Sequence, residues 1–263
     1  MGENYALELR DISKSFGSVQ ANDHVDLTLR KSEILAILGE NGSGKTTLMN
    51  MIYGIYYPDE GHIFVNGKEV TIRSPKDSYE LGIGMVHQHF KLVDVLTAAE
   101  NIVLGLPGKG KLDMKRITED IQKLADKYGF ELDLSQKIYE MSVSQKQTVE
   151  IIKMLYRGAR ILILDEPTAG QDFKHYTEIM EFLRKLNERG VTVVMITHDM
   201  HLMLEYTPRA LVFSDGQLIA DRRASEVLCD PELIERAALK ENKSFYSGKS
   251  LCDHTAGSIC GTI

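Results

Sequence analysis

Apolar and polar residues alternate along several short stretches in the first third of this 263-residue chain. Residues 6–10 and 25–29 show the period of two that is typical of strands with one buried face. Residues 62–65 precede Asn66 and Gly67, a strong hairpin signal, so residues 69–72 are expected to form the returning strand. The first third is therefore predicted to be rich in β-structure.

Helical periodicity replaces this alternation in the middle of the chain, at about residues 89–140. Thr97 can cap a helix together with Glu100, three residues later. Residues 113–128 carry apolar positions at helical spacing, and Gly129 is expected to end that helix. The middle of the chain is therefore predicted to be mostly helical.

Helix and buried strand alternate from Val143 onward. Residues 161–164 and 191–196 are short apolar runs, each tied to a helical stretch, and residues 34–38 form a similar run earlier in the chain. This pattern is typical of parallel strands whose sheet is covered by helices on both faces. Residues 243–263 are small and polar without any period, and a flexible C-terminal tail is expected there.

A glycine-rich segment, GENGSGKTT, follows the apolar run 34–38 and satisfies the pattern G-x-x-x-x-G-K-[ST]. Glycines let consecutive N–H groups point at phosphate oxygens, and the helix that follows adds its positive end. Lys45 is expected to reach the β- and γ-phosphates, and the Thr46 hydroxyl to bind Mg²⁺. The nucleotide-binding residues predicted here are Gly39, Asn41, Gly42, Ser43, Gly44, Lys45, Thr46 and Thr47.

A second strand ends in two carboxylates, Asp165 and Glu166, after the run ILIL. Ligands of open α/β sheets bind at the carboxyl ends of strands, so both acids are expected to face the nucleotide. Asp165 is predicted to hold Mg²⁺, and Glu166 to act on the attacking water. Alone, such a pair could be ordinary solvated acids; the phosphate loop favours the functional interpretation.

On these two motifs, residues 1–240 resemble the ABC (ATP-binding cassette) ATPase family. The resemblance implies a P-loop α/β fold with a mainly parallel sheet core, an N-terminal antiparallel β subdomain and a helical subdomain at about 89–157. Residues 1–242 would form this one cassette. ATP and Mg²⁺ are the implied cofactors.

Further elements of the family pattern lie in the expected order. Gln88 resembles the glutamine that touches Mg²⁺ and couples to a transmembrane subunit; residues 169–172 resemble the D-loop. His198 resembles the switch histidine at the γ-phosphate, and Phe16 lies where an aromatic ring stacks on adenine. Each has a plainer alternative: polar surface for Gln88, a turn residue for His198 and simple core packing for Phe16.

The segment SVSQ lies where the family has its LSGGQ signature, and Ser142, Ser144 and Gln145 are the nucleotide contacts it implies. In the family, two cassettes stack head to tail, and this segment of one copy faces the ATP of the other. Val143 and Ser144 replace the two glycines of the pattern. A serine side chain at the second position is expected to weaken ATP-driven dimerisation and slow turnover.

The resemblance changes along the chain. Residues 39–169 look most like ATPases of nucleoside and simple-sugar importers, whereas GQDFKHYTEIMEFLRKLN, from residue 170, looks most like ATPases of energy-coupling-factor importers. The chain is thus either a natural intermediate or two halves joined near residues 167–170. The implied partners are a second cassette and, for a natural chain, transmembrane permease subunits.

Net charge and composition bear on the expected partners and on the expected cellular location. The formal net charge of −7 argues against general affinity for nucleic acid, so no nucleic-acid partner is expected. No apolar stretch approaches the roughly 18 residues that span a bilayer. The cysteines Cys229, Cys252 and Cys260 match no metal spacing, which favours a reducing compartment. A cytoplasmic location is expected, at the inner face of the cell membrane through partner subunits.

Two other function classes stay open. One is a soluble ABC ATPase without a membrane partner, which the absence of coiled-coil or basic insertions disfavours. The other is a regulatory module that binds ATP but hardly cleaves it. Glu166 and His198 argue against that module, and the altered segment at Ser142–Gln145 argues for it. A turnover assay and co-purification with a membrane protein would separate the classes.

Overall fold

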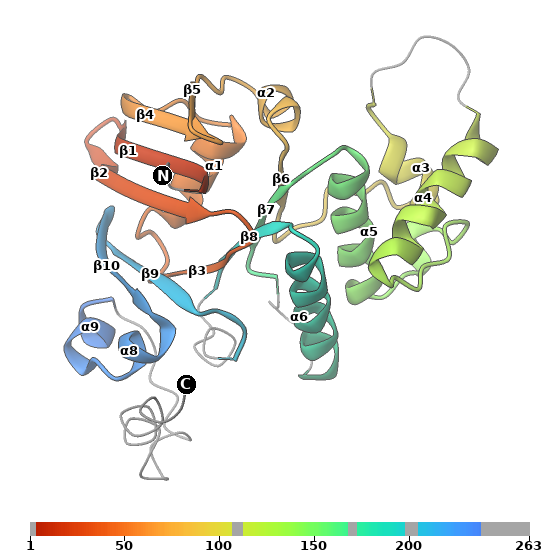
Figure 1. Cartoon of the computed structure of the whole chain (residues 1–263). Helices are drawn as coiled ribbons and strands as arrows, with labels where there is room; N and C mark the ends of the chain where they lie inside the picture. Colours follow the sequence, from red (N-terminus) through yellow and green to blue (C-terminus); the bar gives the residue numbers. More distant parts are fainter. Residues whose placement is uncertain (1–3, 107–112, 168–172, 198–204, 238–263) are drawn as a thin grey trace.

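The computed structural model describes residues 4–106, 113–167, 173–197 and 205–237, which form two sheets and a group of helices (Figure 1). The first sheet is antiparallel, with four strands in the order β2-β1-β4-β5. Its strands are β1 (Tyr5–Phe16), β2 (Val19–Arg30), β4 (Glu60–Val65) and β5 (Lys68–Val70).

The predicted N-terminal strands are confirmed, but they are longer than the alternation indicates. β1 and β2 have 12 residues each, and their pairing shifts register between Leu9 and Ile12. Such bulges let a strand continue where the period of two is broken. The predicted hairpin is also confirmed, since Asn66 (φ 51°) and Gly67 (φ 76°) both take the positive φ that a tight turn of this kind needs.

The second sheet has six strands in the order β10-β9-β3-β8-β7-β6. All neighbours pair in parallel except β10 with β9, as the apolar runs predict. Its strands are β3 (Ile34–Leu38), β6 (Ile83–Val86), β7 (Ile161–Asp165), β8 (Thr192–Ile196), β9 (Arg209–Ser214) and β10 (Gln217–Arg223). Strands from before and after residues 167–170 therefore alternate within one sheet.

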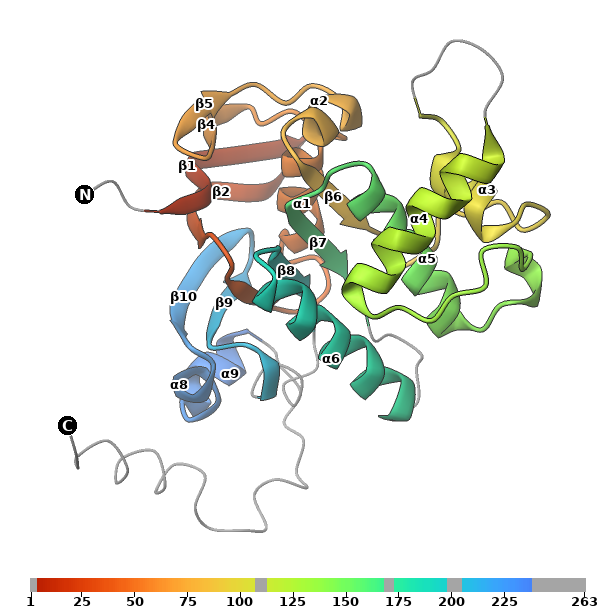
Figure 2. The same cartoon turned by 45° about the vertical axis from the view of Figure 1, so that its right-hand side comes forward.

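Helices cover both faces of this sheet and extend beyond its β6–β7 edge (Figures 1 and 2). They are α1 (Lys45–Tyr53), α2 (Pro75–Glu80), α3 (Ala98–Val103), α4 (Met114–Tyr128), α5 (Val143–Tyr156), α6 (Phe173–Glu188), α8 (Ala224–Leu228) and α9 (Pro231–Arg236), with a 3₁₀ turn, η1 (Ile138–Glu140). Within the described ranges, none has the length and apolar character needed to cross a bilayer.

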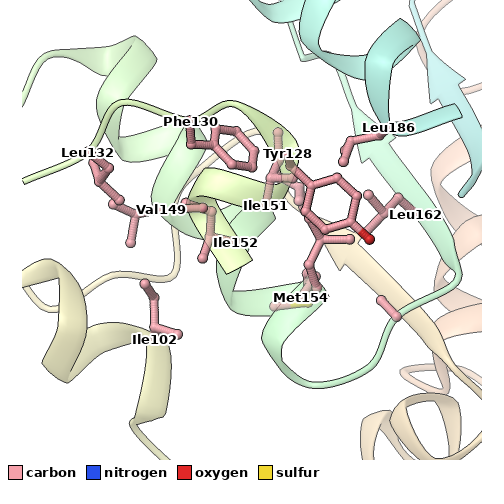
Figure 3. Packing of buried hydrophobic residues seen from close by; sticks show 14 of the residues in the cluster. Ile102, Tyr128, Phe130, Leu132, Val149, Ile151, Ile152, Met154, Leu162 and Leu186 are labelled. Atoms are coloured by element: carbon pink, nitrogen blue, oxygen red, sulfur yellow. The ribbon is translucent and has the colours of Figure 1, made fainter. Parts of the chain in front are cut away.

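The predicted helix ends are found in the middle of the chain. Thr97 and Glu100 form a capping box at α3, and Gly129 ends α4 in the left-handed conformation. The helices of this region share a core with the main sheet. Side chains of α4 and α5, such as Tyr128 and Met154, pack close to Leu162 of β7 (Figure 3).

The first sheet packs over α1, which lies between the two sheets. Leu48 of α1 is fully buried in one cluster with Leu7 of β1 and Leu35 of β3. The fold class predicted from the sequence is therefore correct. The proposed tail at 243–263 lies outside the described residues, and the boundary of the helical subdomain at 89–157 stays a prediction.

Candidate functional site

The carboxyl ends of four neighbouring strands bring the predicted motifs to one edge of the main sheet. β3 leads into the phosphate loop, β8 into Thr197, β7 into the two acids and β6 towards Gln88. The pairing register places the ends of β3, β8 and β7 side by side, because Ile196 pairs with both Ile37 and Asp165. Ligands of open parallel sheets bind at this edge.

Glycine is required in the phosphate loop by close approach of the main chain. Gly39 (φ 151°) and Gly44 (φ 94°) both have positive φ, and an added Cβ would lie 2.4 Å from the Phe213 carbonyl oxygen and 2.2 Å from that of Ala21, respectively. Gly44 is also the N-cap of α1, so the helix begins directly at the loop. Its first N–H groups and its dipole favour an anion there.

Peptide groups of two other segments support this loop. The Gly216 N–H, in the turn between β9 and β10, donates to the Ser43 carbonyl at 3.3 Å, and the Asp23 N–H of β2 donates to the Gly216 carbonyl at 3.0 Å. The Asn22 amide donates to the Gly44 carbonyl at 3.3 Å. Hydrogen bonds from other segments of the protein thus hold the main chain of the loop.

Lys45 lies buried at the centre of the loop. Its ammonium donates to the carbonyl oxygens of Gly39 at 2.8 Å and Glu40 at 2.6 Å. Burial lowers the pKa of Lys45 below its ordinary value, and the charges of Glu166 and Asp165 oppose that shift. The cation is therefore held beside both predicted acids.

The two acids differ in backbone geometry. Asp165 ends β7 half-buried, and burial raises the pKa of its carboxyl; the nearby Glu166 raises it further and Lys45 opposes the rise. Glu166 has φ 49°, which a residue with a side chain seldom adopts, and its N–H donates to the Ile196 carbonyl at 3.0 Å. Such strain is often found at functional sites.

The segment at the start of α5 forms a capping box. The Gln145 N–H donates to the Ser142 hydroxyl at 3.2 Å, and the Ser142 N–H donates to the Gln145 side-chain oxygen at 2.9 Å. α5 begins at Val143, where the sequence analysis expects the alternation of helix and strand to begin, and Ser142 caps it. Ser144 is half-buried in the first turn, and its contacts to a second cassette stay a prediction.

Phe16 is not a core residue. It is 43% exposed at the end of β1, and its ring meets that of Tyr56 edge to face with centroids 5.0 Å apart. No sequence pattern had pointed to Tyr56. Gln88 is exposed two residues after β6, which fits either a ligand contact or polar surface. His198 and the residues 169–172 lie outside the described part of the chain, so their roles stay predictions.

Three polar residues of α5 were missed by the sequence analysis: Gln147, Glu150 and Lys153 are all buried. Polar residues on a helix are normally expected at the surface. The only available signal was the opposite charges of Glu150 and Lys153 at a spacing of three.

The residues present fit a magnesium nucleotide. The hydroxyl of Thr46, the carboxylate of Asp165 and the amide oxygen of Gln88 are the hard oxygen donors that Mg²⁺ prefers. Among the described residues, no group of three or more His, Cys, Asp or Glu could hold a metal alone. Mg²⁺ usually takes several of its ligands from substrate phosphates and water rather than from the protein.

Comparison with known proteins decides the family. Residues 22–169, more than half of the chain, match the sequence profile described as "ABC transporter". The chain belongs to the ABC transporter family. Its fold is that of an ABC ATPase cassette: it superposes on a nucleotide-free ATP-binding cassette with a TM-score of 0.80 and 29% identity, over 90% of this chain and 100% of the other. A dimeric cassette, MJ0796, gives a TM-score of 0.71 and 28% identity over 83% and 98%.

Among curated relatives, the cassette is 46% identical over 192 residues to the guanosine import ATP-binding protein NupO of Bacillus subtilis, covering 72% of this chain and 38% of that protein. It is 44% identical over 221 residues to the nucleoside import ATP-binding protein NupA of Lactococcus lactis, covering 83% and 44%. The chain thus spans less than half the length of these relatives. Neither similarity supports a join at residues 167–170.

Proposed function

We propose that this cassette binds Mg²⁺·ATP at the edge formed by β3, β8, β7 and β6, and that it hydrolyses the nucleotide to drive import through membrane permease subunits. The convergence of Lys45, Asp165 and Glu166 there is the observation that carries the proposal. Mg²⁺, when bound, neutralises charge on the β- and γ-phosphates. Thr46, Asp165 and Gln88 would hold it.

The chain's own residues have separate tasks in this proposal. The loop N–H groups and Lys45 bind the phosphates and offset the charge that grows in the transition state. Glu166 accepts a proton from the attacking water. His198 is predicted to contact the γ-phosphate during that step. Phe16 stacks on the base.

A second cassette is the proposed partner in hydrolysis. The start of α5, with Ser142, Ser144 and Gln145, carries the N–H groups of a helix N-terminus and is accessible, which suits an anion presented by another copy. The dimeric cassette with a similar fold supports this arrangement. ATP would favour the closed dimer, and phosphate release the open one.

Nucleosides are the proposed transported class, because the relatives at 46% and 44% identity are named for guanosine and nucleoside import. A cytoplasmic position at the membrane, through the permease, follows from that role. Uptake of radiolabelled nucleoside by vesicles containing the permease and this cassette tests it. ATP-independent uptake would contradict it.

The nucleotide site is tested with Lys45→Ala. Removing the ammonium should weaken Mg²⁺·ATP binding by about 2–4 kcal/mol, roughly 30- to 1000-fold. Equilibrium dialysis at fixed salt measures it. Lys123→Ala is the matched control, since Lys123 is exposed on α4 and pairs with Asp120. Equal affinity of Lys45→Ala and the parent would refute the site.

A further inference from the structure

A buried ion pair lies on α5, away from the residues that face the nucleotide. The Lys153 ammonium is 3.5 Å from the Glu150 carboxylate, and the two side chains are 9% and 2% exposed. Burial lowers the pKa of Lys153 and raises that of Glu150, so each charge depends on its partner. An apolar pair would serve the core equally well or better, so this pair calls for a role other than stability.

Both members of the pair contact one peptide unit outside their helix. Lys153 donates to the carbonyl oxygen of Lys91 at 3.0 Å. The backbone N–H of Lys91 in turn interacts with the Glu150 carboxylate and favours its charged form. Residue 91 is therefore held through its carbonyl by Lys153, and it lies three residues after Gln88.

The segment that carries Gln88 is fixed at both of its ends. At one end Val86 of β6 pairs with Leu164 of β7. At the other, the Val93 N–H donates to the side chain of Asn101 at 2.7 Å, and the Asn101 amide returns a bond to the Val93 carbonyl at 3.1 Å. Between these anchors, the contact at Lys91 comes from α5.

The same helix begins at the segment proposed to face the ATP of a second cassette. α5 runs from Val143 to Tyr156 as one continuous helix, with Ser142 as its cap. A shift of α5 therefore moves its N-terminus and the Glu150–Lys153 pair together. Through Lys91, that shift reaches the residues around Gln88.

We propose that Glu150 and Lys153 are positioning residues that hold the Gln88 segment in register with the start of α5, by gripping the backbone of Lys91. The inference rests on the proposed role of Gln88 at the Mg²⁺·ATP site. It predicts that the pair links the two segments of one cassette that face two different nucleotides.

The variant Glu150→Leu/Lys153→Met tests the grip. It removes both charges together, so no uncompensated charge stays buried and the fold is preserved. In the nucleotide-free protein, amide exchange at residues 87–92 should become about tenfold faster or more, with residues 34–38 and 161–165 unchanged. Lys123→Met, at an exposed lysine of α4, should leave every segment at the parent rate.

Turnover provides the second measurement. The double variant should lower kcat at least about fivefold, with the Kd for ATP within about twofold of the parent. Lys153→Arg, made alone in the parent, keeps a cationic donor. This variant should therefore retain most of the exchange protection and most of kcat.

Parent-like exchange at residues 87–92 in the double variant overturns the proposal, and so does faster exchange with unchanged kcat. Faster exchange throughout α5 and the sheet would mean that the pair serves stability alone, which also overturns it. If the parent itself lacked ATPase activity, the proposed function would fail, while the exchange measurement would still report on the grip.

Discussion

The side-chain amide of Gln147 donates a 2.7 Å hydrogen bond to the carbonyl oxygen of Pro167, two residues after Asp165. Gln147 is 2% exposed on α5, so the bond lies in the interior. α5 thereby contacts the segment with the two acids as well as the one that carries Gln88. The position of Glu166 is consequently tied to the same helix.

Gln147→Leu should test this link, because leucine keeps most of the volume and removes the donor. We expect a loss of about 1 kcal/mol in the free energy of unfolding and a fall in turnover of roughly tenfold, with ATP binding little changed. Chemical denaturation and phosphate release measure the two effects. Gln122→Leu, at an accessible pair with Asp126 on α4, is the control. Turnover equal to the parent's in Gln147→Leu would show that the Gln147–Pro167 hydrogen bond does not position Glu166.

Glu166→Gln should abolish most hydrolysis while preserving nucleotide binding. The amide keeps the shape and loses the basic oxygen, so turnover should fall about 100-fold or more. The variant should accumulate a dimer in ATP, seen by size-exclusion chromatography with light scattering. Glu119→Gln, on the exposed side of α4, serves as the control. Turnover equal to the parent's would exclude Glu166 as the base.

Ser144→Gly should restore the close approach that the family pattern provides. We expect faster turnover at saturating ATP, by up to about tenfold, or roughly 1.4 kcal/mol. Glycine inside α5 costs helix stability of about 1 kcal/mol, so a melting curve of each form is required. Phosphate release measured across protein concentration reports the dimer. Unchanged or lower turnover would mean that the serine substitutes adequately or that the sandwich does not form.

The sheet order predicts one cooperative unfolding transition. β3 comes from before residues 167–170, yet its neighbours β8 and β9 come from after them. β3 loses both of its neighbours when the second half unfolds, so both halves should melt together. The chain has no tryptophan, and far-UV circular dichroism combined with hydrogen exchange of residues 34–38 and 192–196 gives two probes. Separate transitions would show that the halves do not share a core.

The fold was largely predictable because its signals are local. Periodicity located the strands, Asn66 and Gly67 the hairpin, and Thr97 with Glu100 a helix start. Strand ends were less predictable, since bulges extend β1 and β2 beyond the regular alternation. The order of the six strands in the main sheet depends on contacts between residues far apart in the chain, and the sequence did not predict it.

The site was predictable where it lies on a contiguous motif. Lys45, Asp165 and Glu166 come together as expected because each follows a buried strand. Gln147 and Lys153 were not predictable, because their partners Pro167 and Lys91 are 20 and 62 positions away in the chain. Helical periodicity shows where α5 is apolar, but it does not reveal what a buried polar residue contacts.

The support beneath the phosphate loop is made largely of peptide groups, which substitutions other than proline leave in place. Side chains at Ala21 or Asp23 can therefore vary with little effect on the cradle, whereas Gly216 cannot, because an added Cβ would lie 3.0 Å from the Ala21 carbonyl. The first sheet is thus part of the nucleotide receptor, although its strands do not belong to the main sheet. A substitution that displaces the start of β2 should therefore weaken nucleotide binding, although it touches no residue of the phosphate loop motif.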